Sequence, residues 1–230
     1  MASIPYRSAL IVGAGPGISA SVARGLAAAG LQVGLAARNP DKLAPLASEI
    51  GARAFAVDAS EPNAVAQLFA EADAQLGEPD VVVYNASARA RGPLIELDPQ
   101  EVRKSMAVSA FGGFLVTQQA ARRMIARGRG AILLTGASAS VKGFAQSAAF
   151  AMGKFALRGL AQSAARELGP KGIHVAHFLI DGAVRSETRP DTGDRTLDPD
   201  GIAQAYLDVL RQPRSAWSFE VDLRPWVESF

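Results

Sequence analysis

The 230-residue chain contains no cysteine and only two histidines. The absence of cysteine excludes disulfide bonds, thiolate metal sites, iron–sulfur clusters and a cysteine nucleophile. Tyrosine is also scarce, with three residues at positions 6, 84 and 206. A reaction that uses a phenol as its proton donor must therefore use one of these three side chains.

The sequence also lacks long apolar runs and long blocks of like charge. The formal net charge is +2, so neither a nucleic-acid nor a strongly charged partner is predicted. No apolar run approaches the roughly 18 residues that span a bilayer, and the N-terminus shows no signal-peptide pattern, so we predict a cytoplasmic protein without a membrane partner. Basic residues gather in one place, in a pattern typical of a solvated helix end: Arg122, Arg123, Arg127 and Arg129.

Short continuous apolar runs alternate with helical patterns along the chain. Such runs indicate strands that are buried on both faces. They lie at residues 9–12, 31–36, 54–57, 81–83, 132–134 and 173–179. The apolar residues within 65–76 and 157–168 instead follow a helical period. The alternation predicts an α/β fold with a doubly wound parallel sheet of about seven strands, in a single domain over residues 1–230.

One long irregular stretch, about residues 181–199, interrupts this alternation and is rich in Asp, Arg, Thr, Gly and Pro. A loop of this length in a compact domain is usually functional, so we predict a lid. Arg185, Arg189 and Arg195 lie on it. Two interpretations of these arginines stay open, namely contact with an anionic substrate and ordinary solvation.

A glycine-rich segment follows the first predicted strand and opens a predicted helix. Glycines in this place let the backbone turn tightly beside a pyrophosphate, and the helix N-terminus supplies free N–H groups and a positive dipole end. No Gly-Lys-Ser/Thr follows, which excludes a Walker-type phosphate loop. The placement predicts a dinucleotide site, the alternative being a purely structural turn. The residues concerned are Gly13, Gly15, Pro16, Gly17 and Ile18.

The end of the second predicted strand indicates which dinucleotide is bound. NAD sites usually carry an acidic residue about 20 residues after the glycines, which holds the ribose 2′-hydroxyl. Here the chain reads Ala36-Ala37-Arg38-Asn39, without a carboxylate. Arg38 can pair with a 2′-phosphate and stack on adenine. We therefore predict NADP as the cofactor, with NAD as the alternative.

With these positions placed, the chain resembles the short-chain dehydrogenase/reductase family over nearly its whole length. Gly13 and Gly17 match the family's TGxxxGxG turn, and the segment 84–87 stands where the family has Asn-Asn-Ala-Gly. Lys154 stands where the family has the lysine of Tyr-x-x-x-Lys. The resemblance implies a Rossmann-like fold, a nicotinamide cofactor, a small-molecule substrate and a homodimer or homotetramer.

The resemblance also implies further contacts with the cofactor. Besides Arg38 and the glycine turn, the expected residues are Asp58 and Ala59 at the adenosine, Asn85, Ala86 and Ser87 after the fourth strand, Lys154 at the nicotinamide ribose, and Gly182, Val184 and Ser186 after the sixth strand.

The catalytic positions depart from the family pattern. Phe150 stands four residues before Lys154, where the family has its catalytic tyrosine, and residues at this spacing share one helix face. Ala137 takes the place of the family's serine, with Ser138 as its neighbour, and Ser109 takes the place of the family's helical asparagine. The implied catalytic set is Lys154, Ser138, Ser109 and Phe150, of which only Lys154 keeps the family's residue type.

Three proton sources remain open without a phenol at position 150. Ser138 could relay a proton through water, Tyr84 could reach the site from the fourth strand, and burial could lower the pKa of Lys154. We predict an NADP-dependent oxidoreductase that acts on a small carbonyl or activated-alkene substrate through an atypical proton donor. One alternative is a non-catalytic NADP-binding sensor or interaction protein.

A second alternative is a serine hydrolase, because residues 136–140 nearly match a G-x-S-x-G elbow around Ser138. The two histidines, His174 and His177, show no spacing for a metal site, and we expect them to serve packing.

Overall fold

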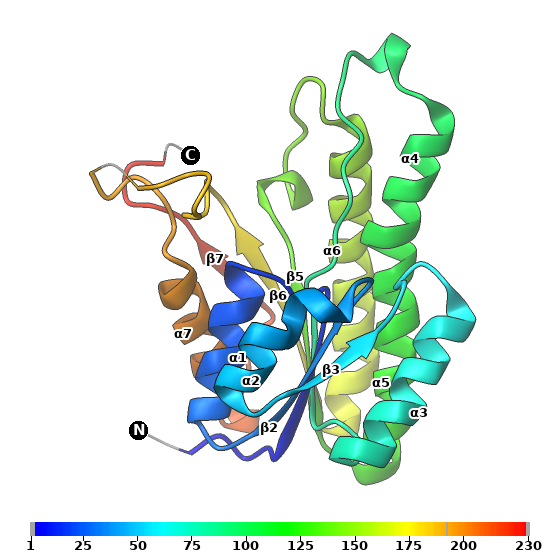
Figure 1. Ribbon diagram of the computed structural model, residues 1–230, viewed down its shortest axis with the longest axis vertical. Helices are drawn as coiled ribbons and strands as arrows, with labels where there is room; N and C mark the ends of the chain where they lie inside the picture. The colour runs from blue at the N-terminus through cyan, green and yellow to red at the C-terminus, as the bar shows by residue number, and fades with distance from the viewer. Residues whose placement is uncertain (1–2, 192, 229–230) are drawn as a thin grey trace.

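The computed structural model describes residues 3–191 and 193–228. Its strands form one parallel sheet in the order β3-β2-β1-β4-β5-β6-β7. The strands are β1 Ser8–Val12, β2 Gln32–Ala37, β3 Arg53–Ala56, β4 Val81–Tyr84, β5 Gly130–Thr135, β6 Ile173–Ile180 and β7 Glu220–Leu223. The predicted single-domain, Rossmann-like α/β fold with its doubly wound sheet is confirmed (Figure 1).

The six apolar runs all form strands, with bounds that differ by one or two residues. The largest difference is in β5, which extends beyond the apolar run 132–134 because it pairs with β4 on one side and β6 on the other. No apolar run marks β7, whose residues are only partly buried at the sheet edge. The pairing of β7 with β6 makes this segment a strand, so the sequence of the segment alone could not predict it.

Helices cover both faces of the sheet. Within the described residues they are α1 Ile18–Ala28, α2 Ala44–Ile50, α3 Pro62–Leu76, α4 Pro99–Met106, α5 Gly112–Arg127, α6 Ala148–Leu168 and α7 Pro199–Leu210. A π-helical turn, Ala107–Phe111, joins α4 to α5. Figure 1 shows α1, α2 and α7 on one face and α3, α5 and α6 on the other. None of the described helices is long and apolar enough to cross a membrane.

Alternate residues of each central strand enter two separate cores. In β1, Leu10 and Val12 pack toward α3, α5 and α6, whereas Ala9 and Ile11 pack toward α1 and α7. All four are fully buried. Burial of a Leu or Ile side chain contributes about 1.5–3 kcal/mol, so the two cores hold the sheet between its two layers of helices.

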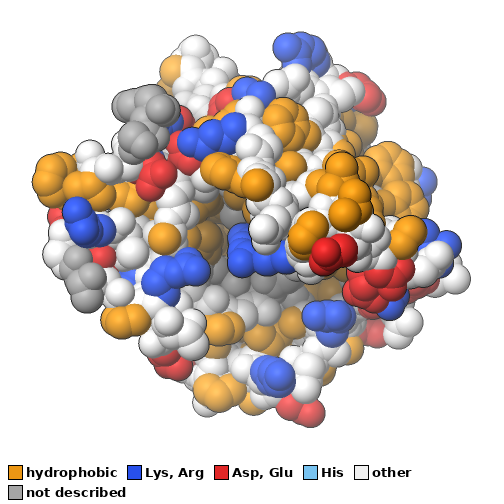
Figure 2. All heavy atoms as spheres, turned by 90° about the horizontal axis from the view of Figure 1, so that it is seen from above, with side chains coloured by type: hydrophobic (Ala, Val, Ile, Leu, Met, Phe, Trp, Pro, Cys, Tyr) orange, Lys and Arg blue, Asp and Glu red, His pale blue; other side chains and the backbone are white. Residues whose placement is uncertain are grey.

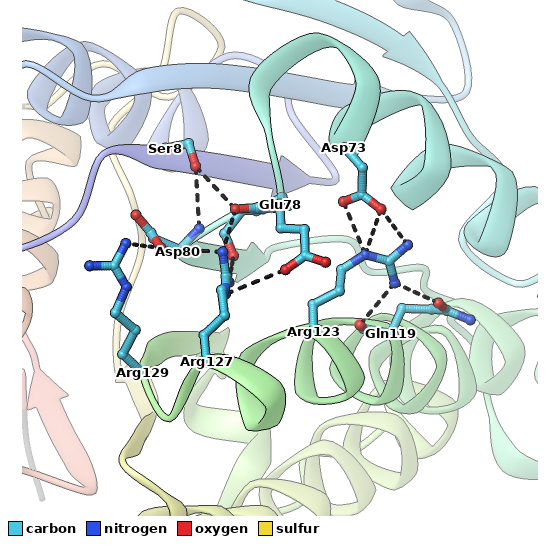
Figure 3. Close-up of polar contacts among 9 residues, drawn as sticks. Ser8, Asp73, Glu78, Asp80, Gln119, Arg123, Arg127 and Arg129 are labelled. Carbon is cyan, nitrogen blue, oxygen red and sulfur yellow. Dashed lines mark hydrogen bonds and ion pairs between the residues drawn. The ribbon is translucent and has the colours of Figure 1, made fainter.

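Three of the four basic residues at the end of α5, namely Arg123, Arg127 and Arg129, are held in ion pairs (Figure 3), which corrects the prediction of a solvated helix end for them, whereas Arg122 is exposed as predicted. The Arg123 guanidinium lies 2.7 Å from the Asp73 carboxylate of α3. Arg127 and Arg129 lie 3.5 Å and 3.2 Å from the buried Asp80 carboxylate. The carboxylates come from α3 and from the segment before β4, which the fold places against the end of α5. The sequence pattern of one helix could not reveal these partners.

Candidate active site

A cleft opens at the carboxyl edge of the sheet, between β1 and β4. The chain leaves these neighbouring strands in opposite directions, and ligands of open α/β sheets bind in the crevice that results. Figure 2 looks onto this edge and shows a hollow with Lys and Arg side chains within and around it. The cleft has a volume of about 280 Å³, and it brings together seven of the predicted cofactor residues: Gly13, Arg38, Asp58, Ala59, Asn85, Ala86 and Ser87.

The glycine turn is fastened to the strands on both sides of β1. The backbone N–H groups of Gly13 and Ala14 donate to the Ala36 carbonyl at 2.9 and 3.0 Å, and the Asn85 side chain donates to the Gly13 carbonyl at 3.3 Å. Gly13 has a φ of +85°, and a Cβ atom there would lie 2.2 Å from the Ala86 nitrogen. Only glycine therefore allows β1 and β4 to end side by side at this point.

The start of α1 is open toward an incoming group. Gly17 caps the helix without a side-chain hydrogen bond, and the first turn contains no acidic residue. A Cβ atom on Gly15 or Gly17 would meet nothing within 4 Å, so open space lies in front of the turn. Ser19 Oγ accepts from the Gly15 N–H at 3.0 Å and stiffens the turn. Free N–H groups and the positive helix end fit a pyrophosphate here.

The end of the cleft beside β2 and β3 carries one cation and one anion. Arg38 directly follows β2, and no carboxylate of the described residues lies within ion-pair distance of it. Asp58 accepts hydrogen bonds from the Ser60 N–H at 2.9 Å and the Ser60 hydroxyl at 2.6 Å. These bonds, with a smaller contribution from the Arg38 charge, hold the pKa of Asp58 below its ordinary value. Asp58 is therefore an ionised, oriented acceptor.

Lys154 and Phe150 share one face of α6, as predicted. The Lys154 Nζ atom lies 5.8 Å from the centroid of the Phe150 ring and donates to the Thr135 carbonyl at 2.7 Å. Both side chains are buried. Burial, with repulsion from Arg89 as a smaller cause, lowers the pKa of Lys154 to about 8. Lys154 can therefore hold or release a proton near neutral pH.

Ser109 is buried in the π-helical turn before α5 and is committed to the backbone. Its Oγ atom accepts from the Ala88 N–H at 3.0 Å and donates to the Ala88 carbonyl at 3.2 Å. A Cβ atom on Gly153 would lie 2.7 Å from the Ser109 Cβ, so α6 packs directly on this turn. This contact fixes α6 against the turn next to Lys154. The catalytic role expected of Ser109 stays a prediction.

Tyr84 does not reach the cleft, which corrects one of the three proposed proton sources. Its side chain is fully buried in the core beneath α5. Its hydroxyl donates to the Val108 carbonyl, and burial raises its pKa well above the ordinary value. The phenolic proton is thus committed within the core because β4 turns this residue inward.

Ser138 lies half-buried at the start of a short 3₁₀ turn, Ser138–Ser140, that precedes α6. Neither histidine hydrogen bonds to it. His174 bonds to the Ser218 carbonyl at 2.8 Å, and His177 bonds to the Glu220 carboxylate at 2.9 Å. The geometry therefore gives no support to a serine hydrolase, which needs a histidine at the serine hydroxyl.

The segment predicted as a lid contacts itself and the C-terminal segment. Val184 forms a bridge with Leu197, and Pro225 packs directly against Gly182. The N–H of Ser186 donates to the Arg189 carbonyl at 2.9 Å. The expected contacts of Gly182, Val184 and Ser186 with a cofactor stay predictions.

Arg89 is a site residue that reasoning from the sequence missed. It lies in the loop after β4, and its guanidinium carbon stacks 4.0 Å above the centroid of the Phe150 ring. The available signal was its place four residues after Asn85, in a loop that leaves the carboxyl end of a central strand. Loops at this edge carry most of the functional side chains in open α/β sheets.

The glycine turn at the β1–α1 junction, the cleft beside it and the buried lysine on α6 define a dinucleotide-binding α/β protein. The sequence model of the short chain dehydrogenase family matches residues 7–195. The chain therefore belongs to the short-chain dehydrogenase/reductase family and is an oxidoreductase of this type.

Individual relatives agree with this assignment. A short-chain dehydrogenase/reductase of Hericium erinaceus is 36% identical over 211 residues, covering 87% of this chain and 83% of the relative. The crystal structure of a short-chain dehydrogenase from Rhodopseudomonas palustris is 38% identical, with a TM-score of 0.83 over 96% of this chain and 99% of the other. A metagenomic short-chain oxidoreductase in complex with NADP is 31% identical, with a TM-score of 0.85 over 96% and 98%.

Proposed function

We propose that the protein is an NADP-dependent oxidoreductase that acts on a small carbonyl or activated-alkene substrate through an atypical proton donor. The observation that carries the choice of NADP is Arg38, which lines the cleft without an ion-pair partner among the described residues. A guanidinium in this place suits a 2′-phosphate, because its planar N–H groups match phosphate oxygens. The relative solved with NADP supports the same choice.

Different groups of residues would bind different parts of the cofactor. The start of α1 would hold the pyrophosphate, Arg38 and Asp58 the adenosine, and Lys154 the nicotinamide ribose. The lid residues 182–186 would close over the nicotinamide. When bound, the cofactor supplies or accepts a hydride, and the protein has to orient it and manage a proton.

Proton transfer falls to groups other than a phenol. Phe150 occupies the position expected for the family's tyrosine and has no proton to give. Lys154 lies next to it with a pKa of about 8, and Ser138 lies half-buried before the same helix. General acid catalysis contributes about 10²–10⁴ in rate. We therefore assign the proton to Lys154, directly or through Ser138 and water.

Substitution of Arg38 tests the choice of cofactor. Arg38→Ala should weaken NADPH binding by about ten- to a hundredfold, because charge-assisted hydrogen bonds to the 2′-phosphate are lost, and should weaken NADH binding by a much smaller factor, because only stacking on adenine is lost. Calorimetric titration with each cofactor measures both affinities. Arg53→Ala is the matched control, since Arg53 is an exposed arginine at the opposite end of the neighbouring strand β3. Equal losses for NADPH and NADH in Arg38→Ala would contradict the proposal.

The second candidate function is a non-catalytic NADP-binding sensor or interaction protein. The absence of a hydroxyl at Phe150 and the commitment of the Ser109 hydroxyl to the Ala88 backbone favour it. Tight NADPH binding without NADPH oxidation, across panels of ketones, aldehydes and enoyl thioesters, would support this candidate over the enzyme.

We also propose that the chain forms a homodimer or homotetramer through α5 and α6. Large apolar side chains on these helices and the turn before them are exposed: Phe111, Phe114, Met152 and Phe155 are 41–51% exposed. Contiguous exposed apolar surface of this kind marks protein interfaces. Light scattering should give a mass that is a multiple of 24.0 kDa, and Phe155→Glu should shift it to that of the monomer. A monomeric wild type would rule the assembly out.

A further inference from the structure

Two cations lie close to the ring of Phe150, which stands in the first turn of α6. The Arg89 guanidinium lies 4.0 Å above the ring centroid, and the Lys154 ammonium lies 5.8 Å from it. An aromatic face attracts such cations but does not neutralise them. The surroundings of this buried ring are therefore electropositive.

The loop that carries Arg89 is fixed on both sides of that residue. On one side, Ser105 Oγ donates to the Ala88 carbonyl at 2.9 Å, and the Ala88 N–H donates to Ser109 Oγ at 3.0 Å. On the other side, the Gly92 N–H donates to the Gln146 carbonyl at 3.2 Å. The guanidinium thus projects from a backbone that is already ordered, which lowers the entropy lost when it binds a ligand.

Two further arginines lie close enough to Arg89 to repel its charge. Partial burial against the ring lowers the pKa of Arg89, and repulsion from Arg91 and Arg189 adds to this effect. No carboxylate of the described residues lies within ion-pair distance of these three side chains. Arg185, on the same lid segment as Arg189, is by contrast paired with Asp198 at 2.7 Å. Only some of the lid arginines are therefore left for an external anion.

We propose that Arg89, assisted by Arg91 and Arg189, binds a carboxylate of the substrate against the Phe150 ring, so that the substrate is an organic acid. The planar guanidinium offers two parallel N–H donors to the two carboxylate oxygens. The Phe150 ring, which is 8% exposed, covers one face of the guanidinium, and this stacking leaves the N–H edge for a carboxylate. This inference rests on the proposed oxidoreductase function, because it names the substrate class of the same site.

Binding of two matched probes, benzoate and its neutral analogue benzamide, tests the carboxylate site without requiring turnover. Saturation-transfer NMR and calorimetry, with and without saturating NADPH, give the affinities. Benzoate should bind at least about tenfold more tightly than benzamide, and Arg89→Met should remove about ten- to a hundredfold of the benzoate affinity. Arg89→Lys should recover part of it, because charge is kept but the two-pronged donor is lost.

The controls separate this site from its neighbours. Arg122→Met, at an exposed arginine of α5, should leave benzoate binding unchanged. Arg189→Met should weaken it by a smaller factor than Arg89→Met, which provides a second variant if Arg89→Met fails to fold. Equal binding of benzoate and benzamide, or tighter binding of inorganic phosphate than of benzoate, overturns the proposal.

The NADPH affinities of the same samples show whether Arg89 belongs to the substrate site or to the cofactor site. If Arg89→Met weakens NADPH as much as benzoate, Arg89 belongs to the cofactor site and the proposal is wrong. If NADPH does not bind at all but benzoate binds through Arg89, the carboxylate site stands and the proposed oxidoreductase function fails.

Discussion

Two groups of arginines, one near each edge of the sheet, differ in their partners. At the amino edge, Arg123, Arg127 and Arg129 each have a carboxylate partner, and the Asp80 carboxylate that serves two of them is almost fully buried (Figure 3). At the carboxyl edge, neither Arg38 nor Arg89 has a carboxylate within ion-pair distance among the described residues. Arginine side chains thus join packed elements at the amino edge, whereas Arg38 and Arg89 contribute positive charge at the carboxyl edge.

This difference indicates which charged groups contribute to the stability of the fold and which lower it. Paired charges at the amino edge join α3, α5 and the entry to β4, so they contribute to the fold. At the carboxyl edge Arg89 has no ion-pair partner among the described residues and is repelled by Arg91 and Arg189, and the buried Lys154 ammonium adds a cost of its own. Such costs are tolerated where a ligand compensates for them.

Substitution of Lys154 should give the largest change and should stabilise the protein. The folded protein holds the Lys154 pKa at about 8, against an ordinary value of 10.5, so below pH 8 the burial of the charge costs about 3 kcal/mol. Lys154→Met removes this cost and also loses the hydrogen bond to the Thr135 carbonyl. We therefore expect a net gain of about 1–3 kcal/mol in the free energy of unfolding at neutral pH.

The pH dependence of this gain identifies its cause. Between about pH 8 and 10.5 the unfolded chain binds a proton at Lys154 that the folded protein has released, so wild-type stability rises with pH in this window. The advantage of Lys154→Met should shrink over the same range. Urea unfolding at several pH values measures it, with Lys171→Met, at a surface lysine beyond the end of α6, as the control. An advantage that is constant with pH would mean that packing, not charge, is responsible.

Removal of Asp80 should change the free energy of unfolding by a comparable amount, with the opposite sign. Its carboxylate also accepts from the Arg7 backbone N–H at 2.9 Å, so Asp80→Ala leaves two arginines and a backbone donor without their partner. The arginines can turn to solvent, which limits the loss in unfolding free energy to about 2–3 kcal/mol. Thermal and urea unfolding measure this loss.

The matched comparison is Arg89→Met, which should change the free energy of unfolding by no more than about 0.5 kcal/mol. Cofactor affinity in Asp80→Ala should remain that of the wild type while the protein is folded. If Asp80→Ala and Arg89→Met cost the same stability, the contrast between the two edges does not hold.

Much of the cofactor cleft could be predicted from the sequence, because its parts are local. The Gly13–Ile18 turn directly follows a buried strand, and Arg38 and Asp58 each stand at the end of another. The order of the strands then places these ends side by side, as the cleft confirms for Gly13, Arg38 and Asp58. The pairing of Phe150 with Lys154 was equally accessible, since it depends only on the spacing along one helix.

The partners of individual side chains could not be predicted in this way. Tyr84 is the last residue of β4, and Asn85 follows it. Side chains alternate along the strand, so the Tyr84 phenol points into the core, where its hydroxyl donates to the Val108 carbonyl. The carboxylates around Arg123 and Arg127 come from segments about 50 residues away in the sequence.

By itself, the sequence determined the alternation of strands and helices, the glycine turn and the absence of a tyrosine at position 150, because these depend on residue type and short spacing. Only the tertiary structure decided which arginines are paired and which have no ion-pair partner among the described residues. Charge pairing depends on distances between segments that the chain brings together only on folding, and Arg89 reaches the Phe150 ring only when the loop after β4 and the first turn of α6 meet at one edge of the sheet.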